Sequence, residues 1–134
     1  MPKLERQIVG NAGLYYVSYR LSQLGWNVMP TARNAKGIDL IAYSIDDPKY
    51  IGVQVKSLSK RDAVSLGKNL DLVIGDYWVI VYKVVDNPVA FIMKPDDVKT
   101  LATPSGQSKE TTYWLETKDY DTDEFREAWS RIEF

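Results

Sequence analysis

The sequence contains no cysteine and no histidine among its 134 residues. Without cysteine, the chain has no disulfide framework and no thiolate metal site. Without histidine, it has no imidazole acid or base, no Ser-His or Cys-His nucleophile pair and no His-ligated zinc. A metal used for hydrolysis would need oxygen ligands, and oxygen ligands favour Mg²⁺ or Mn²⁺.

Long apolar runs are also missing. The longest, residues 77–85, is interrupted by Lys83 and is too short to span a bilayer. The first ten residues carry Lys3, Glu5 and Arg6 and lack the apolar segment of a signal peptide. We therefore expect a cytoplasmic protein with no membrane association.

Net charge is small, at −1, but the two halves of the chain differ. Residues 1–68 hold ten Lys or Arg and five Asp or Glu, a balance of +5, whereas residues 69–134 hold seven and thirteen, a balance of −6. A basic half could face phosphates while an acidic half faces water, and chance asymmetry among solvated charges is the equal alternative. The length and the 45% hydrophobic content suit one core, so we expect residues 1–134 to form a single domain.

Apolar side chains recur at three- and four-residue spacings over residues 4–24 and predict a long opening helix. Gly10 and Gly13 each weaken such a helix by roughly 1 kcal/mol relative to alanine. They indicate either close packing or a helix that begins near Asn11, which is a good N-cap. Gly25 follows in the position that commonly ends a helix.

Alternating side chains and turn residues predict a sheet after this helix. The expected elements are strands at residues 26–31, 37–44, 50–57, 77–85, 89–93 and 113–117, a short helix from Pro95, a loop at 103–111 and a terminal helix at 123–132. Residues 66–74 are consistent with either a helical or an irregular segment. Together these elements predict an α/β fold in which an N-terminal helix precedes a central mixed β-sheet flanked by helices.

Three polar side chains, Asp39, Gln54 and Lys56, occur on the strands that flank the turn at residues 46–49. If the turn is centred after residue 47, Asp39 lies opposite Lys56 and diagonal to Gln54, because side chains alternate with period two. All three then share one face, and a two-residue shift would only exchange the partners. One interpretation is a structural salt bridge between Asp39 and Lys56 in a small interaction domain, with Gln54 filling space.

The other interpretation is phosphodiester hydrolysis, in which a divalent metal polarises the phosphate and activates water. Asp39 is a natural metal ligand, and the side-chain carbonyl of Gln54 and the backbone carbonyl of Val55 can add further oxygen ligands. Lys56 can stabilise charge that develops on the phosphate, since a lysine beside a carboxylate stays charged.

The run Gly37-Ile38-Asp39 followed by Val53-Gln54-Val55-Lys56 resembles the PD-(D/E)XK nuclease superfamily in its D…QxK variant. That variant is similar to Holliday-junction resolvases, and the opening Ala12-Gly13-Leu14-Tyr15-Tyr16-Val17 is similar to small stand-alone bacterial domains of the superfamily. The resemblance covers nearly the whole chain. It implies a restriction-endonuclease-like fold and a Mg²⁺-dependent deoxyribonuclease acting on DNA, which in small enzymes of this kind is often a homodimer.

Leu14 departs from this pattern, because the similar bacterial domains usually carry a glutamate there. Glu5 is the only acid on the opening helix, and it lies about 13 Å away along the axis on the opposite face. The resemblance makes Glu5 a catalytic residue if the helix breaks near Gly10, or if the chain follows the resolvase pattern of an early glutamate. Gln54 stands where many members have glutamate. The alternative function is therefore a catalytically inactive nuclease-fold domain that binds nucleic acid or a protein partner.

Basic residues flank the motif on both sides, with Arg33 and Lys36 before it and Lys60 and Arg61 after it. Such side chains can contact a DNA backbone without specifying sequence. The alternative interpretation is that they are solvated charges on loops.

Overall fold

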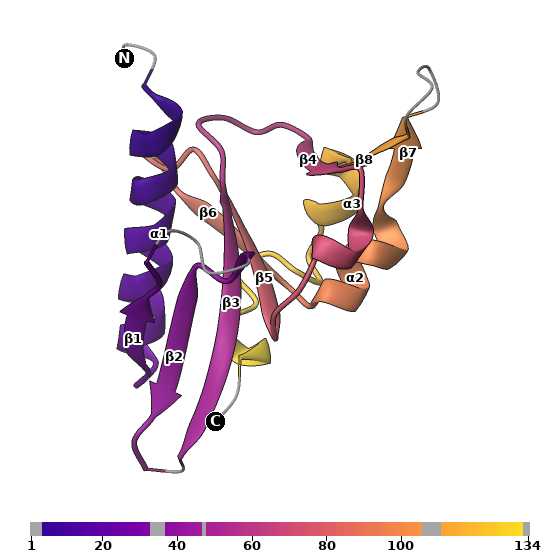
Figure 1. Ribbon diagram of the computed structural model, residues 1–134. Coiled ribbons are helices and arrows are strands. Elements are labelled where there is room, and N and C mark those ends of the chain that lie inside the picture. The colour runs from indigo at the N-terminus through magenta and orange to yellow at the C-terminus, as the bar shows by residue number, and fades with distance from the viewer. Residues whose placement is uncertain (1–3, 33–36, 47, 106–110, 133–134) are drawn as a thin grey trace.

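The computed structural model describes residues 4–32, 37–46, 48–105 and 111–132 (Figure 1). The helices are α1 (Arg6–Gln23), α2 (Pro95–Leu101) and α3 (Thr117–Tyr120), with short 3-10 helices η2 (Leu70–Leu72) and η3 (Trp129–Arg131). The strands are β1 (Asn27–Pro30), β2 (Leu40–Ser44), β3 (Lys49–Ser57), β4 (Val64–Gly67), β5 (Tyr77–Tyr82), β6 (Val89–Met93), β7 (Thr103–Ser105) and β8 (Thr112–Leu115).

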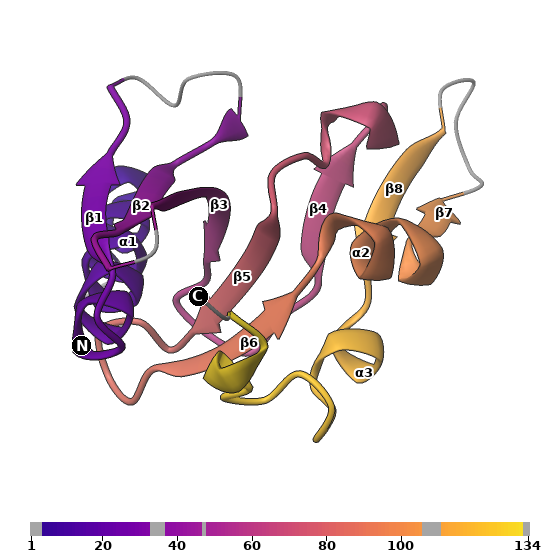
Figure 2. The ribbon, with the colours of Figure 1, turned by 90° about the horizontal axis from the view of Figure 1, so that it is seen from below.

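Two sheets organise these elements. The larger has the order β1-β2-β3-β5-β6, in which β3 and β5 are parallel and the other pairs are antiparallel. The smaller, antiparallel sheet has the order β4-β8-β7. Figure 2 shows α1 beside β1 and β2, and α2 and α3 beside the smaller sheet. The predicted α/β fold, with an N-terminal helix before a central mixed sheet flanked by helices, is confirmed.

Strand β5 has an almost uninterrupted apolar sequence because both of its faces are buried. Val79 and Val81 belong to a first core, which lies between the larger sheet and α1. Trp78 and Ile80 point the other way into a second core, shared with α2, α3 and the smaller sheet. A strand that is buried on both faces cannot alternate with polar residues, so its sequence is a continuous apolar run.

Helix α1 runs unbroken through both of its glycines. A Cβ at Gly13 would lie 1.8 Å from Oγ of Ser57, whereas a Cβ at Gly10 would meet nothing within 4 Å. Gly13 therefore permits a close approach of α1 to β3, and the alternative of a helix beginning near Asn11 is wrong. Gly25, with φ of 96°, adopts the left-handed conformation that ends the helix, as predicted.

The hairpin of β2 and β3 has a different register from the predicted one. Leu40 pairs with Val53 and Ile41 pairs with Gly52. The turn is centred one residue earlier than we expected, which shifts each partner by two residues. If this register is continued by one residue before β2, Asp39 lies opposite Gln54, whereas we had predicted Lys56 as its partner.

The predicted terminal helix at residues 123–132 is wrong, because this segment holds only the single turn η3. Phe125 is buried in the second core, whereas Trp129 and Ile132 are buried in the first. One helical face cannot enter two cores, so the segment winds past β6, and the Glu127 amide donates to the Ala90 carbonyl at 2.7 Å.

Two short strands were also not predicted, namely β4 and β7. Strand β4 pairs with β8, which is distant in sequence, so its formation depends on long-range contacts that local patterns do not reveal. Strand β7 pairs with β8 across a short connection, so the predicted loop at 103–111 is wrong over Thr103–Ser105. Within the described ranges, no helix combines the length and the apolar character needed to cross a membrane.

Candidate active site

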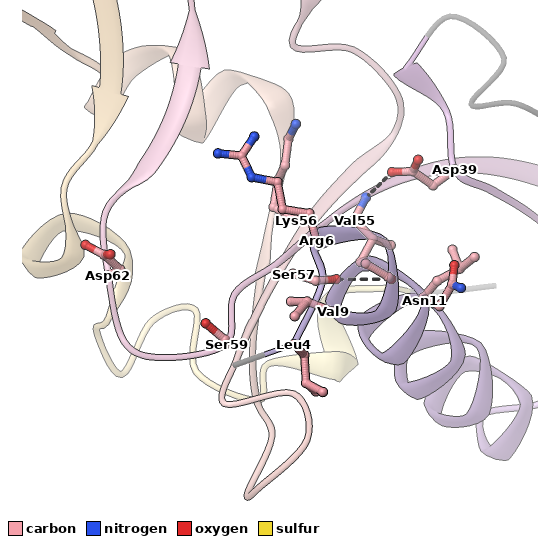
Figure 3. Close-up of a pocket in the computed structure, with 12 residues that line it drawn as sticks. Leu4, Arg6, Val9, Asn11, Asp39, Val55, Lys56, Ser57, Ser59 and Asp62 are labelled. Atoms are coloured by element: carbon pink, nitrogen blue, oxygen red, sulfur yellow. Dashed lines mark hydrogen bonds between the residues drawn. The ribbon is translucent and has the colours of Figure 1, made fainter. Parts of the chain in front are cut away.

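A pocket of about 670 Å³, here called the first pocket, opens between the first turns of α1, the end of β3 and the residue before β2 (Figure 3). Asp39, Val55 and Lys56 line its sheet side, and Leu14 and Arg6 line its helix side. The close approach of α1 to β3 at Gly13 holds the helix side and the sheet side of this pocket next to each other.

Asp39 is fixed by the sheet immediately before β2 begins. Its amide donates to the Val53 carbonyl at 3.0 Å, and its Oδ2 accepts from the Val55 amide at 2.7 Å. Its other carboxylate oxygen accepts no hydrogen bond from any described residue. Burial raises the pKa of Asp39 above its ordinary value, and the Val55 hydrogen bond and the charge of Lys56 offset this only in part. One hydrogen bond thus orients the carboxylate, and its second oxygen can still bind a ligand.

Lys56 is the second-last residue of β3, half-buried and without a direct ion pair to any described carboxylate. Its Nζ lies 5.8 Å from the centre of the Trp78 ring, within the range of a cation–π contact. The ammonium group is close enough to lower the pKa of Asp39 without being neutralised by it. It can therefore meet a negatively charged ligand in the first pocket.

Gln54 is only 8% exposed and points away from the first pocket. Its Oε1 accepts from the indole N–H of Trp78 at 2.5 Å. An indole nitrogen can only donate, so the oxygen of the amide is the atom engaged. The structure thus places Gln54 next to Lys56 but turns its carbonyl towards Trp78. Of the predicted metal and catalytic residues, Lys56 and Val55 line the first pocket together with Asp39, and Gln54 does not.

The helix side of the first pocket presents no acid. Leu14 lines it at the position where the sequence resemblance led us to look for a glutamate. Glu5 is the exposed N-cap of the unbroken helix and does not line the pocket. The structure therefore does not bring Glu5 together with Asp39.

Sequence reasoning missed two charged residues that line the first pocket, Arg6 and Asp62. Figure 3 shows the side chains of Arg6 and Lys56 extending in the same direction, with Asp39 and Asp62 on opposite sides. Arg6 precedes Gly10 and Leu14 by one and two turns, so an i, i+4, i+8 pattern could have placed it on the same helix face. Asp62 lies in the loop after β3, for which no local pattern exists.

The predicted DNA-contacting residues have different environments. Lys60 is exposed on the loop that follows β3. Arg61 follows it, but its Nε donates to Asp121 Oδ2 at 2.8 Å, so its charge is already paired within the protein. Arg33 and Lys36 lie outside the described residues.

No group of three or more acidic residues gathers as a metal site in the part of the chain that the structure describes. Mg²⁺ in phosphate-handling sites is often held by one or two carboxylates, with waters and substrate phosphates as the remaining ligands. The free oxygen of Asp39 fits such a substrate-completed site. Gln54 could contribute only by giving up its hydrogen bond to Trp78.

Comparison with known proteins agrees with the fold. No family model matches the chain, and no curated protein matches its sequence. The solved structure of a bacterial homing endonuclease, I-Ssp6803I, matches with a TM-score of 0.65, covering 96% of this chain and 93% of that one at 16% sequence identity. At such low identity the match shows the fold, which is endonuclease-like.

Proposed function

We propose that this chain is a Mg²⁺-dependent deoxyribonuclease-like domain that hydrolyses phosphodiester bonds in the first pocket. One observation carries the proposal: Asp39 and Lys56 line the same pocket of an endonuclease-like fold. Asp39 is held by one amide and has an oxygen that accepts from no described residue, and Lys56 forms no ion pair with a described carboxylate. A carboxylate that retains a free oxygen can hold a cation, and a nearby ammonium group can hold a phosphate.

The proposed roles follow from these positions. The Val55 amide holds one oxygen of Asp39 in place, which fixes the side-chain rotamer. The other oxygen is therefore already oriented to bind a cation. Lys56 binds the phosphate and stabilises the charge that builds up on it. When bound, Mg²⁺ would polarise the phosphate and lower the pKa of a water molecule. Arg6, on the helix side, adds a second positive charge for the nucleic-acid backbone.

The test is a cleavage assay with purified protein, double-stranded, single-stranded and branched DNA, and Mg²⁺ or Mn²⁺. Asp39→Asn should lower the cleavage rate by at least about 100-fold, as expected for the loss of a metal-binding carboxylate. Asp76→Asn is the matched control, because Asp76 Oδ2 also accepts from an amide of β3, that of Gly52 at 2.8 Å, but lies away from the first pocket. Cleavage that persists at the wild-type rate in Asp39→Asn would overturn the proposal.

The second candidate function is a catalytically inactive nuclease-fold domain that binds nucleic acid or a protein partner. Leu14 favours it, because the helix side of the first pocket offers an apolar group where a second acid would strengthen metal binding. A wild-type chain that binds DNA without cutting it, together with a Leu14→Glu variant that cuts, would support this candidate. Calorimetric Mn²⁺ binding that is present in the wild type and lost in Asp39→Asn would count against it.

A further inference from the structure

A second pocket, of about 680 Å³, lies on the other side of β3, where the larger sheet faces β4 and the segment around η2. Its walls are largely apolar and include Trp78, Leu66, Leu72 and Ile74. Pockets of this size and character commonly bind small, mostly apolar groups that a few polar atoms orient. The proposed function makes no use of this pocket.

Gln54 supplies such a polar atom. Its side chain is 8% exposed and lines the second pocket. Because its Oε1 is engaged by Trp78, the amide Nε2 carries the remaining hydrogen-bonding capacity, and it donates to none of the described residues. Because Gln54 lines the second pocket, this N–H is available to an acceptor on a ligand that enters the pocket.

Lys56 connects the two pockets, because it lines both of them. In a nucleotide the base and the phosphate are joined through one sugar. A phosphate held by Lys56 on the side of the first pocket therefore has its own base within reach of the second pocket.

We infer that the second pocket receives an unpaired nucleobase, and that the substrate class is DNA with an extruded or unpaired base next to the phosphate. This inference rests on the proposed function and specifies its substrate. The apolar walls formed by Leu66, Leu72 and Ile74 suit the faces of a base, whereas Trp78 is buried and holds the Gln54 amide in place. The Gln54 amide donates to an acceptor on the edge of the base, and the exposed carboxylate of Asp71 can accept from an amino group.

The charges of the second pocket favour a base over a phosphate. Among the described lining residues, Lys56 and Asp71 contribute one charge of each sign, so these residues give no positive excess for an anion. The burial of Gln54 excludes a base that remains paired in the duplex, because a groove edge cannot reach a side chain that is 8% exposed. A base must leave the stack to reach it.

The test measures binding in EDTA, so it does not depend on cleavage. Three fluorescein-labelled duplexes share one sequence: one is fully paired, one has a single unpaired nucleotide, and one has an abasic residue at that nucleotide. The abasic duplex keeps the backbone distortion and lacks only the base. Apolar contact with the faces of the base and one hydrogen bond predict a dissociation constant about tenfold lower for the duplex with the unpaired base than for the abasic one.

Variants locate the effect. Leu72→Glu places a charge on the rim of the second pocket, and Ser65→Trp fills its mouth from β4, so both should reduce the tenfold ratio to about one. Ile45→Glu is the matched control, since Ile45 is 66% exposed and Leu72 is 67% exposed. It makes the same change of charge away from the pocket and should leave the ratio unchanged.

Each outcome bears on one proposal. A ratio near one in the wild type, or a tenfold ratio that survives Leu72→Glu and Ser65→Trp, overturns the inference. Cleavage that depends on Asp39 together with a ratio near one overturns the inference alone. A tenfold ratio without any cleavage supports the base pocket and counts against catalysis. Failure to bind any of the three duplexes overturns the inference and points to a ligand of another class, such as a protein side chain.

Discussion

Replacement of Gly13 by alanine tests how the contact between α1 and β3 forms the first pocket. The added Cβ would lie 1.8 Å from Oγ and 2.7 Å from Cβ of Ser57, so the helix and the strand must separate. Such overpacking costs about 1–3 kcal/mol, and the helix propensity of alanine returns about 1 kcal/mol. We therefore expect Gly13→Ala to lower the free energy of unfolding by up to about 2 kcal/mol, and to weaken the proposed activity by moving Leu14 away from Lys56.

Urea unfolding followed by circular dichroism measures this change, and two comparisons isolate its cause. Gly10→Ala lies in the same helix with nothing within 4 Å of the new Cβ, and should raise stability by about 1 kcal/mol. In a Ser57→Gly background the nearest remaining atom is Cα of residue 57 at 3.5 Å, an ordinary contact. There the alanine should become stabilising, with a coupling free energy of about 2 kcal/mol. If Gly13→Ala is as stable as Gly10→Ala, the close approach does not determine the packing.

Three other substitutions test charges and a buried amide by the same urea titration. Burial raises the pKa of Asp39, so the ionised carboxylate opposes folding once the pH is above the folded-state pKa. Asp39→Asn removes this charge and should raise the free energy of unfolding by about 0.5–1 kcal/mol at pH 7. In acid, where Asp39 is protonated, the variant should lose this advantage. For Asp121 the sign is opposite, because its lowered pKa adds stability that is lost as the pH falls through the folded value. Asp121→Asn should therefore cost about 1–2 kcal/mol at pH 7 and little once the carboxyl is protonated in acid. Trp78→Phe leaves Oε1 of Gln54 without its donor and should cost about 1–3 kcal/mol. Equal stabilities of each variant and the wild type across the pH range would contradict these assignments.

Local patterns predicted the elements that repeat one simple rule. The 3.6-residue spacing of α1 and the doubly buried run of β5 are visible in the sequence because each element buries a regular set of positions. The predicted register of the β2–β3 hairpin was wrong by two residues, since it depends on turn geometry. A shift of two preserves the faces of the strands, so Gln54 and Lys56 remained neighbours.

The remaining errors come from contacts between distant segments. The segment after residue 122 has helix-like spacing, but its apolar residues enter two different cores and its backbone follows β6. In the candidate site, strand alternation brought Asp39 and Lys56 to one region, but it could not show that Trp78 turns the amide of Gln54 towards the second pocket. Nor could it place Asp62, which reaches the first pocket through a loop.

Two carboxylates of this chain show what distinguishes a structural acid from one available to a ligand. Asp121 is 5% exposed at its side chain, and burial raises its pKa, but Arg61, Arg126 and Tyr82 surround it and bring the pKa below its ordinary range. Asp39 has one donor, the Val55 amide, and its pKa stays raised although Lys56 is nearby. A salt bridge that served only stability would bring Asp39 and Lys56 into contact, as it does for Asp121 and Arg61. Their separation within one pocket leaves each with unused capacity, and a cation bound to a phosphate would satisfy both at once.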